Sequence, residues 1–297
     1  MLLHLHLHQY TMLLNSKLIV LVSVYTASLA SPIKKCKFPK KEGLVSVYAD
    51  GVNAGWAMSP DEACVPGKYC PYACPPGQLM NQWNPEAKTY LYPTSMDGGL
   101  YCNSDGSTSK PFDDRELCVE GEGTVSVVNN AAKDVAFCQT VLPGNEAMLI
   151  PTNVESGEEQ VLAVPGPDYY ASTAAHYYVN PPGVSTKNGC IWGTSDKEVG
   201  NWAPYVAGMN TDSSGNTFVK IGVNPKHIDD FSGNTPNFGL RIVCDNPEDC
   251  NGLECELNPK NGYNKAQGPS SGVSLGAEYC IVTARNHAKA KIEVFEV

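Results

Sequence analysis

The chain has 297 residues, a net charge of −10 at neutral pH, and 42% hydrophobic against 18% charged residues. This hydrophobic content is enough for a sizeable core, and an acidic chain without a strong basic patch is not a typical nucleic-acid-binding protein. The 27 glycines and 22 prolines, about one residue in six, favour many short strands over long helices.

Residues 1–30 have the character of a secretory signal peptide. Lys17 precedes an apolar run over residues 18–24, and small residues up to Ala30 predict cleavage after that position. The run is short for a membrane span, and no later stretch is a candidate. We therefore expect a secreted protein without a membrane partner, in which residues 31–43 form a short basic arm and residues 44–297 form one domain.

All twelve cysteines follow the predicted cleavage site. An even number of cysteines in a secreted chain predicts disulfide bonds, up to six, whose connectivity the sequence does not reveal. The pairs Cys70-x3-Cys74 and Cys250-x4-Cys255 lack the accompanying histidine pair of a zinc site. We expect neither a metal nor a cofactor.

The segment from residue 61 to residue 118 has little regular apolar pattern and five cysteines, so it needs disulfides to hold one shape. The stretch "SPDEAC" (59–64) predicts one short helix here. Ser59 can cap it and Pro60 suits its first position.

From Gly121 onward the pattern becomes regular. "GTVSVVNNAAKDVAFCQTVLPG", "NEAMLIPTNV" and "EEQVLAVPG" predict strands, as do "FGLRIVCD" and the last 22 residues. The clearest hairpin is "NWAPYVAGMNTDSSGNTFVKIGVN", with two apolar runs around a polar turn that contains glycine. The sequence therefore predicts an all-β, disulfide-rich β-sandwich with a loop-rich N-terminal part held by cysteines.

Carboxylates are the strongest candidates for catalysis. The chain has no Gly-x-Ser-x-Gly motif, and its few histidines lie in no known motif. Cleavage of a glycosidic bond needs two carboxylates, and we select Glu62, Asp97 and Asp212. Glu62 lies among the cysteines, Asp97 precedes two glycines and Asp212 follows "YVAGMNT". The alternative is that each one is a cap or turn residue.

Aromatic and amide side chains give a second indication of a sugar site. Pyranose rings pack on aromatic faces, and amides bind their hydroxyls. The candidates are Asn81, Gln82, Trp83, Tyr177, Tyr178 and Trp202. Adjacent tyrosines on a strand face opposite sides, so only one of the 177–178 pair can line a groove. The alternative is that these aromatic residues belong to the core.

Several segments together resemble the fungal SUN family of secreted cell-wall proteins. They are "SPDEACVPGKYCPYACPPGQLMNQW", "GGLYC", "YYVNPPGVSTKNGCIWG", "GNWAPYVAGMNTDSSGNTFVKIGVNP" and "CNGLEC". The family spacing Cys-x5-Cys-x3-Cys-x24-Cys is matched at Cys64, Cys70 and Cys74, whereas 27 residues separate Cys74 from Cys102. The resemblance covers about residues 44–297 and supplies no catalytic residues. "GNWAPYVAG" and the many cysteines are also similar to thaumatin-like β-sandwiches.

The resemblance implies a β-glucosidase-like protein of the fungal cell wall or medium that acts on β-1,3-glucan in septum formation and cell separation. We therefore predict a secreted, monomeric glycoside hydrolase or transglycosylase acting on β-1,3-glucan or another wall polysaccharide. The alternative is a non-catalytic glucan-binding protein of the wall.

Overall fold

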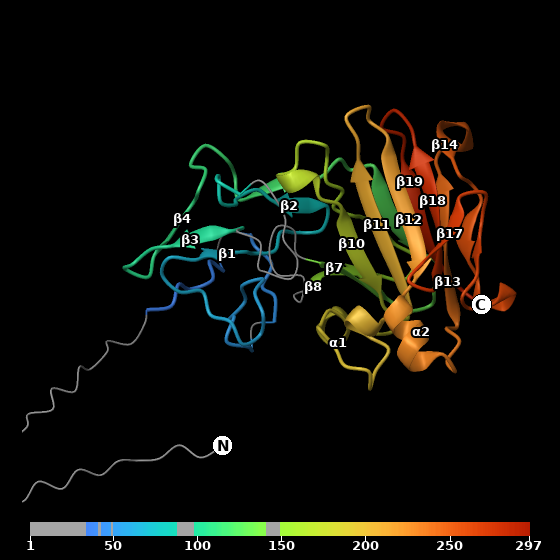
Figure 1. Cartoon of the computed structure of the whole chain (residues 1–297), viewed down its shortest axis with the longest axis horizontal. Helices are drawn as coiled ribbons and strands as arrows, with labels where there is room; N and C mark the ends of the chain where they lie inside the picture. The colour runs from blue at the N-terminus through green and yellow to red at the C-terminus, as the bar shows by residue number, and fades with distance from the viewer. Residues whose placement is uncertain (1–33, 41–42, 49, 88–97, 141–148) are drawn as a thin grey trace, which may run out of the picture. The chain divides into compact units, whose positions relative to one another are not determined.

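A computed structural model describes residues 34–40, 43–48, 50–87, 98–140 and 149–297. The predicted signal peptide and Asp97 lie outside these residues. Residues 124–297 form two sheets that pack face to face, which we call the sandwich, and residues 34–120 form a cysteine-rich region (Figure 1).

Among the described residues, the large sheet of the sandwich has eight strands, seven of them in one continuous order with β17 (Ser271–Ser274) pairing with β18. The order is β14 (Cys250–Asn251), β18 (Ala277–Ala284), β12 (Thr217–Val223), β11 (Tyr205–Thr211), β10 (Ala175–Val179), β7 (Val135–Thr140), β8 (Leu149–Val154). All of its pairs are antiparallel.

The second sheet has six strands within the same described part of the chain. Their order is β16 (Ala266–Gln267), β15 (Cys255–Leu257), β13 (Phe238–Cys244), β19 (Ala290–Glu296), β6 (Val125–Asn129), β9 (Glu159–Val161). The pair β19–β6 is parallel. The strand predicted from "AKIEVFEV" is confirmed, and β19 lies between β13 and β6 in this sheet.

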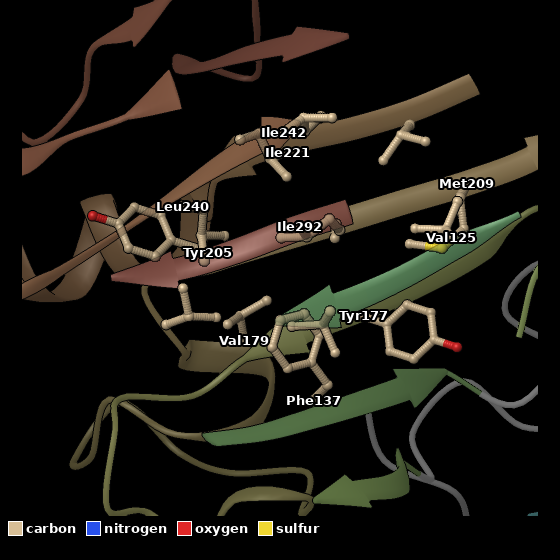
Figure 2. Packing of buried hydrophobic residues seen from close by; sticks show 14 of the residues in the cluster. Val125, Phe137, Tyr177, Val179, Tyr205, Met209, Ile221, Leu240, Ile242 and Ile292 are labelled. Carbon is tan, nitrogen blue, oxygen red and sulfur yellow. The ribbon is translucent and has the colours of Figure 1, made fainter. Parts of the chain in front are cut away.

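The core lies between the two sheets, where alternate residues of each strand point inward (Figure 2). On β11, Tyr205 and Met209 are buried while Val206 and Asn210 face the other side. From the second sheet, Leu240 meets them with no exposed surface. Fully burying an apolar side chain of this size contributes about 1.5–3 kcal/mol, so this interface dominates the stability of the sandwich.

All twelve cysteines form disulfides, which confirms the disulfide-rich all-β fold. The six bonds are Cys36–Cys102, Cys64–Cys70, Cys74–Cys118, Cys138–Cys190, Cys244–Cys250 and Cys255–Cys280. Cys255 lies on β15 and Cys280 on β18, so the last bond joins the two sheets. The cysteine-rich region contains three of the six bonds.

The described part of the cysteine-rich region has short strands. They are β1 (Tyr69–Cys70), β3 (Leu100–Cys102) and β4 (Thr108–Ser109) in one sheet, and β2 (Gln78–Met80) and β5 (Cys118–Glu120) in another. Trp56 and Tyr72 are large, buried side chains of its small core. Cys36 and Phe38 are buried in the same core, so this part of the predicted basic arm belongs to the folded unit.

The predicted hairpin and the predicted short helix had different outcomes. The hairpin is confirmed, because β11 and β12 pair from Tyr205↔Val223 to Thr211↔Thr217. The helix predicted over residues 59–64 is wrong, since this segment is a turn in which Glu62 N–H donates to the Ser59 carbonyl at 2.9 Å.

Two short helices, α1 (Thr186–Gly189) and α2 (Pro225–Phe231), follow β10 and β12, respectively. Asn224 caps α2, and its side-chain oxygen accepts from Lys226 N–H at 3.1 Å. Within the described ranges, neither the helices nor any other helical segment is long and apolar enough to span a bilayer.

Candidate active site

A pocket of about 310 Å³ lies where the cysteine-rich region meets the segment that follows β9. We call it the Trp83 pocket. Its lining residues are Leu79, Asn81, Trp83, Arg115, Val119, Glu120, Gly121, Glu122, Gly166, Pro167, Asp168 and Tyr169. The pocket thus combines two of the predicted sugar-binding residues, Asn81 and Trp83, with three carboxylates and one guanidinium group.

Aromatic contacts fix the orientation of the half-buried Trp83. Its ring lies 5.4 Å from that of Phe112, 5.9 Å from that of Tyr169 and 5.8 Å from that of Tyr170, centroid to centroid. The Arg115 guanidinium lies 5.1 Å from the ring centroid. Edge-on contacts of this kind hold a ring in one orientation, so Trp83 offers the pocket a rigid aromatic surface.

Gln82 supports this arrangement from inside the protein. It has no exposed surface, and its amide N–H groups donate to the backbone carbonyls of Phe112 and Arg115, each at 3.1 Å. Its amide oxygen accepts from Phe112 N–H at 2.9 Å. The predicted substrate contact is therefore turned away from solvent, and Gln82 instead positions the loop that carries Arg115.

Two close backbone contacts place Glu122 at the pocket. Its N–H donates to the Val164 carbonyl at 2.9 Å, and Gly121 N–H donates to Gly77 at 2.9 Å. A Cβ atom at Gly121 would lie 2.8 Å from the Val164 nitrogen, and one at Gly166 would collide with the Glu122 carboxylate. Glycine at position 121 allows the close backbone approach to Val164, and glycine at position 166 leaves room for the Glu122 carboxylate.

The three carboxylates differ in their surroundings. Glu122 is half-buried, and its Oε2 lies 3.8 Å from His287 Nδ1. Glu120 is exposed, and its Oε1 accepts from Gln78 Nε2 at 2.6 Å. Asp168 is exposed on the turn before Tyr169. Glu122 and Asp168 come from different segments of the chain, and both line the pocket.

A family model described as "Beta-glucosidase (SUN family)" matches residues 32–282. The chain belongs to the SUN family. It is 57% identical over 269 residues to the uncharacterized protein YMR244W of Saccharomyces cerevisiae, covering 88% of this chain and 76% of that protein.

Two further relatives carry names that state an activity. The chain is 52% identical to "Probable secreted beta-glucosidase adg3" of Schizosaccharomyces pombe, over 88% of this chain but only 23% of that protein. It is 36% identical to "Secreted beta-glucosidase SIM1" of Candida albicans, over 85% of this chain and 65% of that protein. The chain thus spans less than two thirds of both of these relatives.

The acids selected from the SUN-family sequence lie outside the Trp83 pocket or outside the described residues. Glu62 is in the turn of the cysteine-rich region and pairs with Lys68 Nζ at 2.7 Å. Asp212 is in the β11–β12 turn, where Oδ1 accepts from Ser214 N–H at 2.8 Å and from Asn216 N–H at 2.9 Å. Asp97 belongs to the residues that the structure does not describe.

The other predicted aromatic residues are dispersed over the SUN domain. Tyr177 points into the core, where its hydroxyl accepts from Ala163 N–H at 2.9 Å. Tyr178 lies on the opposite, outer face of the large sheet. Trp202 is half-buried, and its indole N–H donates to Asp230 Oδ2 at 2.6 Å.

A buried histidine near α2 forms a second polar cluster. His227 is fully buried, with Nε2 2.9 Å from Glu198 Oε2 and Nδ1 2.6 Å from the Tyr263 hydroxyl. Burial, with the charges of Tyr205 and Glu198, raises the pKa of Tyr263 far above its usual value. His227 lies on α2, so these two hydrogen bonds tie α2 to Glu198 and Tyr263.

The one group of potential metal ligands found among the described residues is Cys36, Cys64 and Cys102. All three sulfurs are in disulfides, which removes the thiolates that a metal needs.

Sequence reasoning missed Glu120, Glu122 and Asp168. The two glutamates lie in "CVEGEG" and the aspartate in "VPGPD", where glycines and prolines beside acids are the only local indication. Their meeting with Trp83 depends on contacts between segments more than 30 residues apart, for example Tyr169, whose hydroxyl donates to the Met80 carbonyl at 2.7 Å. No short motif contains this information.

Proposed function

We propose that this SUN-family chain is a secreted fungal glycosidase that cleaves or transfers β-1,3-glucan chains, with the Trp83 pocket as its active site. The single observation that carries the proposal is that Trp83 and Asn81 share one pocket with Glu122 and Asp168. The names of its relatives adg3 and SIM1 support a β-glucosidase activity. The disulfides support an oxidising, extracellular location.

The proposed chemistry uses four side chains. Trp83 packs against a pyranose face and Asn81 binds a sugar hydroxyl. Of Glu122 and Asp168, one donates a proton to the leaving glycosidic oxygen. The other either attacks the anomeric carbon as a nucleophile or, as a base, takes a proton from the water that attacks this carbon. Water then supplies the hydroxyl of the new reducing end, or a second sugar takes its place in transfer.

Glu120 is the weakest of the three carboxylates for this role. Its hydrogen bond to Gln78 holds the carboxylate against β2, whereas no such side-chain bond from β2 engages Glu122 or Asp168 among the described contacts. We propose further that the activity serves wall remodelling, septation and cell separation, and that the protein acts as a monomer in the fungal wall or medium.

The test is an assay of purified protein on soluble β-1,3-gluco-oligosaccharides, with product chains separated by size. We expect Glu122→Gln and Asp168→Asn each to lower the rate by about 10²–10⁴-fold, the usual contribution of a general acid or base. Glu120→Gln is the matched control, since it removes a charge from the same pocket, and we expect a small effect.

Two outcomes would overturn the proposal. One is full turnover by the Glu122→Gln/Asp168→Asn double variant. The other is loss of turnover in Glu62→Gln or Asp212→Asn with the pocket variants unaffected, which would return the site to the residues selected from the sequence. A native protein that binds glucan without turnover would favour the non-catalytic alternative.

A further inference from the structure

The outer face of the large sheet carries a groove that the proposed chemistry does not use. This sheet groove has a volume of about 390 Å³ and crosses β10, β11 and β12 as far as β18. Side chains that define it include His176, Tyr178, Asn210, Phe218 and Lys220. Its volume lies within the usual range of small-ligand sites.

A glycine without a structural role forms the floor of the groove. Gly208 is in the middle of β11, between His176 and Lys220 in the strand register. Among the described residues, a Cβ atom added there would meet only the Ala175 carbonyl oxygen, at an ordinary 3.8 Å, and the backbone is not in the left-handed region. Neither packing nor backbone conformation therefore explains a residue that weakens a strand.

Gly222 differs from Gly208 in its surroundings. Gly222 lies on the same face of β12, opposite Tyr279, and a Cβ atom there would approach the Tyr279 Cβ to 3.0 Å. Packing within the protein explains Gly222. Gly208 instead keeps the floor of the groove open, which is the role of a strand glycine where a ligand approaches closely.

The groove wall suits an uncharged ligand with many hydroxyls. Tyr178 and Phe218 bring aromatic rings, while His176 and Asn210 bring hydrogen-bonding groups. No carboxylate occurs among the described residues that line it. Lys220, the one lysine or arginine among these described lining residues, lies over the Tyr279 ring with Nζ 3.8 Å from the centroid, and burial lowers the pKa of Lys220.

We infer that the sheet groove is a second carbohydrate-binding site, which takes an uncharged β-glucan chain and holds the polymer apart from the Trp83 pocket. The inference rests on the proposed function only for the choice of glucan. The absence of carboxylates from the described lining makes the groove a binding site without hydrolytic chemistry of its own.

Gly208→Val gives the most direct test, because valine projects into the groove and suits a strand better than glycine does. Binding of purified protein to insoluble β-1,3-glucan is measured by depletion from solution over a range of glucan concentrations. We expect the apparent Kd to rise about tenfold or more in Gly208→Val, with a thermal midpoint equal to or above that of the native protein.

Phe218→Ser removes an exposed ring from the groove and is expected to weaken binding in the same direction. Val273→Ser is the matched control, since Val273 is 65% exposed on β17 of the same sheet but does not line the groove. We expect the control to bind as the native protein does.

Native affinity in both Gly208→Val and Phe218→Ser would overturn the inference, as would equal losses in the Val273→Ser control. A change of oligomeric state in Gly208→Val with unchanged glucan binding would assign the groove to protein contacts instead. The two proposals fail separately. Binding that Gly208→Val weakens in a protein without turnover rejects only the proposed hydrolysis, whereas turnover without groove-dependent binding rejects only the second site.

Discussion

The sandwich and the cysteine-rich region reach a fixed shape by different means. The longest strand of the sandwich has 8 residues, and its two sheets enclose a continuous apolar core. The cysteine-rich region has strands of 2 or 3 residues and a smaller core around Trp56 and Tyr72, with three disulfides. The sandwich has three disulfides as well, yet its strands pair over a continuous apolar core, whereas the shorter cysteine-rich region relies more on its covalent bonds and buried polar contacts.

Buried amides hold loops of the cysteine-rich region that lack regular strand pairing. Asn53 is 1% exposed, and its side-chain N–H groups donate to the Val47 and Trp56 carbonyls at 2.9 and 2.8 Å. Gln82 does the same for the loop that carries Arg115. The Trp83 pocket takes its aromatic wall from this region and Asp168 from the edge of the sandwich, so its geometry depends on both kinds of stabilisation.

Among the changes predicted to separate the sandwich from the cysteine-rich region, removal of the Cys36–Cys102 disulfide is expected to have the largest effect. The bond closes a loop with a sequence separation of 66, for which chain entropy predicts a loss of about 4 kcal/mol of unfolding free energy in Cys36→Ser/Cys102→Ser. We expect amide exchange in the cysteine-rich region to become fast and turnover at the Trp83 pocket to fall, while the sandwich stays protected.

The Cys138–Cys190 bond is the matched control, with a sequence separation of 52. Cys138→Ser/Cys190→Ser is expected to lower the unfolding free energy by a similar amount but to keep protection throughout the sandwich core. Equal protection of both regions in the two variants would show that disulfides are no more important to one region than to the other.

Gln82→Leu is expected to cost about 1–3 kcal/mol, because the variant leaves buried backbone carbonyls of Phe112 and Arg115 without their donors. Urea unfolding measures the loss, and turnover on oligosaccharides should fall as Arg115 shifts. The sequence instead suggested that Gln82 contacts the substrate directly. A higher KM at native stability would support that role and contradict the one in positioning.

The sandwich could be predicted from the sequence because its information is local. Alternation along "YVAGMNT" and "TFVKIGV" and a glycine-containing turn predict the pairing of β11 with β12. The cysteine-rich region offers no such pattern. The turn at residues 59–62 had helix-capping residues but lacked a following apolar stripe, so its capping signals were not enough to form a helix.

The difference between local and long-range information also explains which residues of the Trp83 pocket could be selected from the sequence. Asn81 and Trp83 line the Trp83 pocket and were selected by their residue type alone. Glu122 and Asp168 were not, since only the long-range contact of residue 122 with Val164 brings them to the pocket. A residue type can thus suggest a role, but no local pattern predicts which distant segments of the chain come into contact.

Buried tyrosines should make the sandwich sensitive to alkali. Burial raises the pKa of Tyr177 and of Tyr205 well above 10, the usual value of the phenol group. Their contribution to stability is therefore complete below pH 10 and is lost as the pH rises above it, when the unfolded chain ionises first. Each such tyrosine contributes up to about 1.4 kcal/mol per pH unit to the fall in unfolding free energy.

Tyr205→Phe isolates one of these contributions. It removes the hydrogen bond from the Tyr205 hydroxyl to the Phe238 carbonyl, at a cost of about 1 kcal/mol near neutral pH. Its unfolding free energy should then fall less steeply than that of the native protein between pH 10 and pH 11. Parallel slopes would mean that the hydroxyl ionises as readily in the folded protein as in the unfolded chain.

The smallest expected effect on stability is at Asp212. A variant at this position tests whether the carboxylate is catalytic or only stabilises the turn between β11 and β12. Hydrogen bonds from Asn216 and Ser214 lower the pKa of Asp212, and the backbone N–H of Asn216 contributes most. A lowered pKa in the folded state stabilises the protein above the pKa of the unfolded chain, and this contribution is lost as the pH falls through the folded value.

Asp212→Asn keeps an acceptor oxygen but loses the charge, so we expect a slightly lower thermal midpoint at pH 7. The difference from the native protein should disappear at acidic pH, below the usual aspartate pKa of 3.8. Turnover on oligosaccharides should persist, because the carboxylate is engaged within its own turn and does not line the Trp83 pocket. Abolished turnover at an unchanged midpoint would instead make Asp212 catalytic and separate the active site from the cysteine-rich region altogether.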